Sequence, residues 1–306
     1  MRISNPVVCI LHKAFPCLLA IVLTIHARCV YAAESDAPAP FAAGEKLVFR
    51  VEWNPPWYLF FLPSVEAGEA ELLLAQELDY KGEKALKIVF KARSSGALVR
   101  LIGLKVDDTF EYITNAETFC TFTATRRVRE GKHKRDIEVV YLPESESLHI
   151  HDVDLSVVPN KVRKDTYKDN VPKCVRDLFS ALYWVRYQDF QVGTVRSSVV
   201  GNDDRVKEVE SVVEKKEVVV TPIGKFEAWR LNTIAILGSL FKDGGQFRFW
   251  LTADERRLPV QFEAKVQLGK VTGKLKVVEL PPSSSERPSA GNKNSHEFHE
   301  SHEKNP

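Results

Sequence analysis

Residues 171–190, VPKCVRDLFSALYWVRYQDF, form the stretch with the clearest helical pattern in this chain of 306 residues. At about 100° per residue its apolar side chains gather on one wide face, whereas polar side chains such as Asp177 and Ser180 lie opposite. Pro172 suits a first helical turn, because its φ angle is already near the helical value. Much of the remaining chain alternates apolar and polar residues as strands do. We therefore predict a mainly β protein, an antiparallel barrel or a strongly curved open sheet wrapped around one central amphipathic helix at residues 171–190.

Arg186 breaks the helical pattern, because it lies about 60° around the wheel from the first residue, within the apolar face. A buried cation without a partner is strongly unfavourable, so the fold must offer this guanidinium a carboxylate, a set of carbonyl groups or an anionic ligand. An ion pair within the protein is the commoner arrangement for a buried charge. The alternative makes Arg186 a candidate ligand-binding residue.

The first 32 residues have the features of a secretory signal peptide. Arg2 and Lys13 precede an uncharged apolar run at residues 14–25, and Ala32 supplies a small residue at the expected cut. This run is too short to span a bilayer, and no later stretch reaches the roughly 18 apolar residues that a span requires. We predict cleavage after Ala32, export to the periplasm with secretion as the alternative, and no transmembrane span in the mature form.

Removal of the signal peptide changes the counts of charges and cysteines. The remaining chain has 40 basic and 41 acidic residues, so its charge does not indicate nucleic acid as a partner. Two of the five cysteines remain, Cys120 and Cys174. In an oxidising compartment they could form a disulfide that ties the helix to the strand near Cys120. The alternative is that both are small buried hydrophobic side chains.

Composition divides the exported chain into three parts. Residues 33–43 form a polar, proline-containing leader, which we expect to be flexible. Residues 44–280 carry the strand patterns and the helix, and we predict that they form a single β-rich domain. Residues 281–306 are rich in serine, proline and charged side chains, so we predict a disordered tail.

Residues 53–65, WNPPWYLFFLPSV, combine prolines near both ends with a run of large apolar side chains. The prolines disfavour a helix or a central strand and favour a loop or an edge segment. Its large side chains include Trp57, Tyr58, Phe60 and Phe61, a grouping that surface loops rarely expose. Either the loop contacts a lipid, a hydrophobic ligand or a partner, or it folds back and plugs one end of the β structure.

Two hairpins are predicted from alternating segments. Residues 126–135, RRVREGKHKR, have Glu130 and Gly131 at the turn and six cations around it. These cations could meet phosphate head groups or an acidic partner, or they could simply keep a hairpin end soluble. A second hairpin joins residues 247–252 to residues 258–266.

The chain lacks the common catalytic motifs G-x-S-x-G and H-E-x-x-H. His149 and His151 would share one face of a strand, but no third ligand stands at a suitable spacing for a metal site. We therefore predict no metal, no cofactor and a non-enzymatic function, and a hydrolase is disfavoured.

Several short motifs resemble a family of exported proteins of Gram-negative bacteria that is catalogued as a domain of unknown function. The resemblance covers residues 44–280 and implies an exported β-rich domain without an assigned activity. The motifs are G-E-K-L at residues 44–47, A-G at 67–68, D-D at 107–108, E-G at 130–131, D-L-x-S-A-L-Y-x-x-R at 177–186, T-P-x-G-K at 221–225 and W-L-T-x-D-E-x-R-x-P at 250–259.

From these features we expect an envelope protein that binds an apolar or amphipathic ligand, a lipid among the candidates. Its candidate ligand-binding residues are Arg186, Trp57, Tyr58, Phe60 and Phe61. The alternative is a structural or assembly module that docks to another envelope protein. A cavity beside the helix would favour ligand binding, whereas a filled interior would favour docking.

Overall fold

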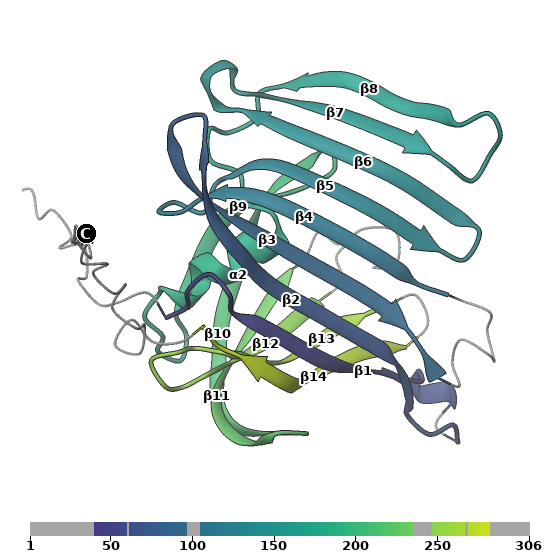
Figure 1. Ribbon diagram of the computed structural model, residues 1–306. Coiled ribbons are helices and arrows are strands. Elements are labelled where there is room, and N and C mark those ends of the chain that lie inside the picture. Colours follow the sequence, from purple (N-terminus) through teal and green to yellow (C-terminus); the bar gives the residue numbers. More distant parts are fainter. Residues whose placement is uncertain (1–39, 60, 97–104, 235–245, 267–268, 282–306) are drawn as a thin grey trace, which may run out of the picture. The chain divides into compact units, whose positions relative to one another are not determined.

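The computed structural model describes residues 40–59, 61–96, 105–234, 246–266 and 269–281 (Figure 1). Within these residues there is one α-helix, α2 (Leu178–Arg186), and two short 3-10 helices, η1 (Trp57–Leu59) and η2 (Pro143–Ser145). The strands are β1 (Lys46–Asn54), β2 (Val65–Tyr80), β3 (Glu83–Ser94), β4 (Asp107–Asn115), β5 (Thr121–Glu130), β6 (His133–Leu142), β7 (Ser147–Asp154), β8 (Lys161–Asp169), β9 (Val195–Asn202), β10 (Arg205–Thr221), β11 (Gly224–Ile234), β12 (Gln246–Thr252), β13 (Pro259–Lys265) and β14 (Lys270–Glu279).

In the described residues, all fourteen strands form one antiparallel sheet, in the order β8-β7-β6-β5-β4-β3-β2-β1-β14-β13-β12-β11-β10-β9. Nearly every strand pairs with its neighbour in the sequence, and the pairing of β1 with β14 joins the two halves of the sheet. Strands β8 and β9 are the edges, so the sheet is open. It curves around α2 (Figure 1), which confirms the predicted curved open sheet with a single helix.

The helix is shorter than predicted. Asp177 caps it, because its carboxylate accepts the backbone N–H groups of Phe179 and Ser180, while the Ser180 hydroxyl accepts the backbone N–H of Asp177. The residues before this cap are not helical, and Arg176 forms a parallel bridge with Val200 of β9. The helix therefore spans Leu178–Arg186 rather than residues 171–190, and Pro172 lies outside it.

Two side chains on the polar face of the predicted helix are buried rather than exposed to solvent. Asp177 and Ser180 are buried, with 3% and 0% of their surfaces exposed. Both contact Thr121 of β5, whose hydroxyl lies 3.0 Å from a carboxylate oxygen of Asp177 and 3.2 Å from the hydroxyl of Ser180. Buried polar groups need hydrogen-bond partners, and these two residues find theirs in β5. Hydrogen bonds therefore hold the start of the helix against the sheet.

Both predicted hairpins are present, as β5–β6 and β12–β13, but strand β8 had no sequence signal. All nine of its residues are exposed, so neither face selects apolar side chains.

Three of the six cations predicted at the β5–β6 hairpin are paired with carboxylates. Arg126 is buried against Asp203, Arg129 pairs with Asp136 and Arg135 pairs with Asp152.

Two apolar clusters fill the inside of the curved sheet. The larger contains side chains from β1 to β7, from β10 to β14 and from α2, and the ring of Phe179 stacks on Phe90 with centroids 4.4 Å apart. The smaller surrounds Val185, Leu231 and Phe249. Each fully buried aliphatic or aromatic side chain contributes about 1.5–3 kcal/mol. Leu182 and Trp184 of the helix pack against both clusters, and the space on the β9–β12 side of the helix holds the candidate site.

Candidate functional site

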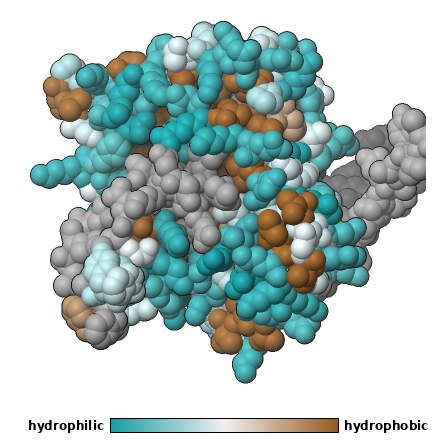
Figure 2. Space-filling view, turned by 180° about the vertical axis from the view of Figure 1, so that it is seen from behind, coloured by the Kyte–Doolittle hydropathy of each residue, from teal (hydrophilic) through white to brown (hydrophobic). Residues whose placement is uncertain are grey.

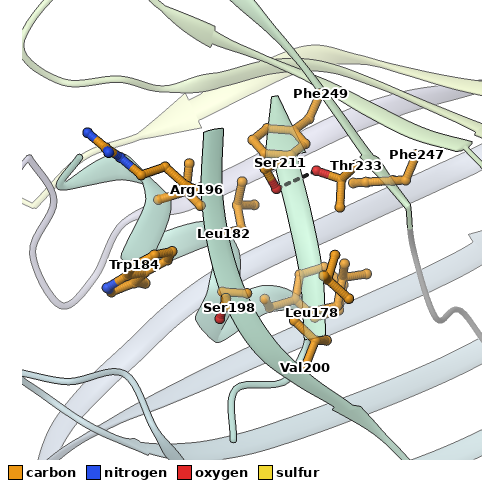
Figure 3. Close-up of a pocket in the computed structure, with 14 residues that line it drawn as sticks. Leu178, Leu182, Trp184, Arg196, Ser198, Val200, Ser211, Thr233, Phe247 and Phe249 are labelled. Carbon is orange, nitrogen blue, oxygen red and sulfur yellow. Dashed lines mark hydrogen bonds between the residues drawn. The ribbon is translucent and has the colours of Figure 1, made fainter. Parts of the chain in front are cut away.

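A small apolar pocket lies between α2 and strands β9 to β12 (Figure 3). Its free volume is about 60 Å³. The wall from the helix contains Leu178, Leu182 and Trp184, which are only half-buried although the helix lies inside the sheet. The wall from the sheet includes Phe247 and Phe249. The helix therefore buries one face fully and leaves its other apolar face facing a cavity.

Few polar groups line this pocket. Ser211 of β10 and Thr233 of β11 face each other with their hydroxyl oxygens 2.5 Å apart, as the dashed line in Figure 3 marks. Arg196 of β9 lies at the margin and donates one hydrogen bond to the carbonyl oxygen of Asp189, at 3.1 Å. Its Nε is buried and has no hydrogen-bond partner. A buried guanidinium N–H beside an apolar pocket can donate a hydrogen bond to an anionic or carbonyl oxygen of a ligand.

Arg186 does not line this pocket, because it lies at the end of the helix inside a closed ion pair. Its terminal nitrogens donate to the two carboxylate oxygens of Glu45 at 2.6 and 2.9 Å. The carbonyl oxygen of Arg256 accepts a further hydrogen bond at 3.0 Å, and the guanidinium lies over the ring of Phe41. Arg186 and Glu45 are 0% and 1% exposed. The structure thus places a protein carboxylate where the alternative hypothesis placed a ligand.

The surroundings of this ion pair join three distant parts of the chain. Glu45 precedes β1, Arg186 ends α2, and Arg256 lies in the turn between β12 and β13. Tyr183 donates a hydrogen bond to Glu45 at 3.2 Å, and burial raises the pKa of this tyrosine well above its usual value. The pair therefore has a clear role in holding the helix end against both halves of the sheet.

The proline-flanked aromatic loop does not plug the sheet. Trp57 is 86% exposed, Phe61 is 67% exposed and Tyr58 is 53% exposed. Phe60 lies outside the described residues. The hypothesis that this loop folds back into the core is wrong for these three side chains. Their exposure leaves the hypothesis of a contact with a lipid, a ligand or a partner.

The remaining candidates have structural partners. Cys120 and Cys174 form a disulfide, which links the segment before α2 to the residue before β5. His149 and His151 lie on one face of β7, and Asp165 of β8 approaches them at 2.8 and 3.6 Å. Among the described residues no group of three or more His, Cys, Asp or Glu side chains could hold a metal ion.

A second cavity of about 460 Å³ lies between residues 41–43 and strands β2 and β3. Its lining includes Glu77, Asp79 and Lys84, and it is less enclosed than the pocket beside α2. The rest of its lining is apolar, but its charged groups and wider opening leave it less suited to enclosing an apolar ligand than the pocket beside α2. The enclosed apolar pocket is the stronger candidate.

Sequence reasoning missed the residues of this pocket. Leu182 belongs to the apolar face of the predicted helix, and the sequence predicts no role for Arg196. No local signal could have identified Arg196, because its position beside the helix depends on the pairing of β9 with β10. The helix itself was the usable signal, since it carries half of the pocket wall.

A comparison with solved structures finds matches at low sequence identity. A crystal structure of a β-barrel-like protein of the domain of unknown function DUF1849 from Brucella abortus has a TM-score of 0.50 and 12% identity, over 79% of this chain and 99% of that chain. An exported protein with a YmcC-like fold, as it is described, from Bacteroides fragilis NCTC 9343 has a TM-score of 0.30 and 9% identity, over 78% and 97%. A protein of Parabacteroides distasonis ATCC 8503 that is described as a lipoprotein has a TM-score of 0.28 and 7% identity, over 80% and 100%.

No curated protein matches this chain. In the described part of the chain, no helix has the length and apolar character that a membrane span needs. The family model for DUF3108, described as a protein of unknown function, matches residues 48–276. This range begins within β1 and ends within β14, so it includes the helix, the pocket and the Arg186 end of the helix. The chain therefore belongs to the DUF3108 family of proteins of unknown function.

Proposed function

We propose that this protein is an exported, non-enzymatic envelope protein that binds the apolar part of a small amphipathic ligand in the pocket beside α2. The observation that carries the proposal is the combination of an apolar pocket with the buried, unengaged Nε of Arg196 at its margin. Apolar walls with few polar groups are typical of ligand sites. A ligand with an acyl or alkyl end and an oxygen-bearing head would match both features.

The pocket volume limits what can enter. A cavity of about 60 Å³ holds roughly two groups of the size of water, and a cavity of about 150 Å³ is needed for benzene. We infer that the pocket takes the end of a chain and that α2 moves away from β9 when a longer chain enters. Leu178 and Leu182 are the side chains that such a movement would uncover.

The inferred location of the protein is consistent with a role in the cell envelope. We infer that the signal peptide is removed after Ala32 and that the protein acts in the periplasm, or outside the cell as the alternative. The disulfide between Cys120 and Cys174 supports this location, because disulfides persist in oxidising compartments.

The first test is native mass spectrometry of protein purified from its own producing cells, followed by organic extraction of any bound compound. Purified protein is then titrated with lauric acid. We expect a bound amphiphile or a saturable laurate complex, and we expect Arg196→Gln to weaken laurate binding by about tenfold, as for the loss of one charge-assisted hydrogen bond. Arg93→Gln serves as the matched control, because this exposed arginine lies on β3, away from the pocket.

A clean mass without any bound compound, together with no laurate binding, would overturn the proposal. The alternative function, a module that docks to another envelope component, would then gain. Strand β8 favours that alternative, since it is an exposed edge strand that could accept a strand from a partner. Pull-down with β8 side chains replaced by proline would test it.

A further inference from the structure

One end of the sheet gathers the β1–β2, β5–β6 and β7–β8 connections. The register shows this: Trp53 pairs with Val65 across β1 and β2, and Gly68 pairs with Ser94 across β2 and β3. From there Arg93 pairs with Asp107, Val106 bridges to Glu130, and Arg135 pairs with Asp154. In Figure 1 this end lies on the right, where η1 projects beyond the sheet.

The β1–β2 connection exposes an aromatic lip, which we define as Trp57, Tyr58, Phe61 and Leu62. Their exposed fractions are 86%, 53%, 67% and 39%. The rings of Trp57 and Tyr58 contact each other edge to face at 5.9 Å, so the lip is an organised surface. No charged residue occurs between Trp53 and Val65. Tryptophan and tyrosine are the side chains enriched where an apolar phase meets water.

The same end carries a second apolar projection and a group of cations. Val158 in the β7–β8 turn is 98% exposed and Val157 is 43% exposed. The β5–β6 hairpin lies between these two projections in the strand order, and it exposes Lys132 and Lys134 at its tip. At about 5 Å per strand and four strand spacings, this tip lies about 20 Å along the sheet from the lip.

The view from behind shows this end as two separate projections. In Figure 2 a pale to brown projection stands at the lower left, where η1 lies, and a brown one at the upper left, where the β7–β8 turn lies. The acidic side chains at this end are largely paired, since Glu66 lies 3.8 Å from Arg50 and Asp107 lies 3.1 Å from Arg93. Glu130 at the same tip is partly buried, which raises its pKa to about 7, so the two exposed lysines leave the tip with a net positive charge.

We propose that this end of the sheet docks onto the surface of an anionic lipid bilayer. Two separate apolar projections with lysines between them can enter a fluid lipid interface at the same time. A protein partner would instead need a rigid surface that is complementary to both projections and to the lysines. Each basic side chain near an anionic surface strengthens binding about fivefold. The apolar side chains add affinity in proportion to the surface that they bury. The proposal does not rest on the pocket beside α2, because none of its residues lines that pocket.

The test is co-sedimentation of the purified protein with vesicles of phosphatidylethanolamine and phosphatidylglycerol, and with vesicles of phosphatidylcholine alone. We expect binding to the anionic vesicles that weakens as salt is added. Trp57→Ser/Phe61→Ser should weaken it by at least about tenfold, and Lys132→Gln/Lys134→Gln by about 25-fold at low salt. The matched control is Val218→Ser/Ile223→Ser, which removes exposed apolar side chains at the opposite end of β10 and β11.

Three results would overturn the proposal. The first is no binding of the unchanged protein to anionic vesicles at low salt, and the second is equal binding of the lip variant and the control variant. The third is self-association of the unchanged protein in sedimentation velocity, lost in the lip variant, without vesicle binding; the lip would then contact a second copy of the chain. If the lip variant does not fold, the salt dependence of the unchanged protein and its preference for phosphatidylglycerol still decide the matter. If the protein binds laurate but does not bind vesicles, the proposed function is still supported and only the proposed membrane-docking surface is rejected.

Discussion

The guanidinium of Arg186 shows how a single residue can look functional in a sequence and be structural in the fold. It is fully buried and makes two short hydrogen bonds to Glu45, which is 141 residues away in the chain. A buried pair of this kind pays a desolvation cost for both charges, so its net contribution to stability is small, but the loss of one partner is severe. The two residues therefore depend on each other.

We predict that Arg186→Met destabilises the protein by about 3–5 kcal/mol, because it leaves the carboxylate of Glu45 buried without its partner. Glu45→Gln should cost a similar amount. The double variant should cost clearly less than the sum of the two, since it leaves no unpaired charge. Urea unfolding of the four proteins measures this coupling, and additive losses would show that the pair is not coupled.

Glu130, at the tip of the β5–β6 hairpin, should make stability depend on pH. Burial, with a smaller effect from the negative charge of Asp108, raises its pKa from the ordinary value of 4.5 to about 7. Between these values the folded protein binds more protons than the unfolded chain, so the contribution of Glu130 to stability falls as the pH rises.

We therefore predict that Glu130→Gln, which imitates the protonated form, has little effect near pH 4.5 and stabilises the protein by about 1 kcal/mol above pH 7. This magnitude allows for screening by solvent, because the side chain is partly exposed. Urea midpoints measured below and above this range check it, with Glu117→Gln in an exposed turn as the control. An equal effect of Glu130→Gln at both ends of the range would rule out the titration.

At the scale of elements, α2 is fixed at both of its ends. The cap formed by Asp177 and Ser180 is bonded to Thr121, and the disulfide lies directly before it in the sequence. At the other end, Arg186 is held by Glu45 and by the carbonyl oxygen of Arg256. Between these ends the helix packs on one face and leaves the pocket on the other. Any movement that enlarges the pocket must therefore tilt or bend the helix between fixed ends.

We predict that Cys120→Ser/Cys174→Ser lowers the free energy of unfolding by about 4 kcal/mol. The two cysteines are separated by 54 residues, and a disulfide that closes such a loop restricts the unfolded chain by about this amount. Urea unfolding with and without a reducing agent measures the effect. Reduction should destabilise the unchanged protein and leave the double variant unaltered, and an effect of the reductant on the variant would assign the loss to another cause.

At the scale of the whole sheet, the tip of the β9–β10 hairpin links the two halves. Arg126 of β5 pairs with Asp203 at 2.9 Å, and Lys164 of β8 pairs with Asp204 at 2.5 Å. Gly201 lies against Tyr141 of β6 so closely that an added Cβ would stand 2.2 Å from its hydroxyl oxygen. The curvature that creates the pocket thus depends on contacts between strands at opposite ends of the sheet order.

We predict that Gly201→Ala destabilises the protein by about 1–3 kcal/mol, because the methyl group overlaps the Tyr141 hydroxyl and has Val175 2.8 Å away on its other side. Tyr141→Phe in the same chain should recover part of this loss, since it removes the oxygen in the closest contact. Thermal unfolding of the two single variants and the double variant provides the measurement. A double variant no more stable than Gly201→Ala would mean that the clash lies elsewhere.

Local chemistry in the sequence was sufficient for several conclusions. The alternation of apolar and polar residues predicted most strands and the two hairpins, because one face of each strand is buried and selects its side chains. The helical pattern predicted the central helix, and the position of Arg186 within it predicted a buried charge that needs a partner. The resemblance to a family of unknown function was confirmed by the family model over residues 48–276. The helix start was predictable in part, since Asp177 and Ser180 have the spacing of a reciprocal cap.

Only the tertiary structure decided the remaining features, for physical reasons. The partner of Arg186 could not be found locally, because Glu45 reaches it only after β1 pairs with β14 and the sheet curves around the helix. Strand β8 carries no pattern, because all of its residues remain exposed. The exposure of the aromatic lip and the pocket beside Arg196 also depend on which strands are neighbours. Sequence determines which side chains must be buried or paired, whereas contacts between distant strands determine which partners they meet and where space is left.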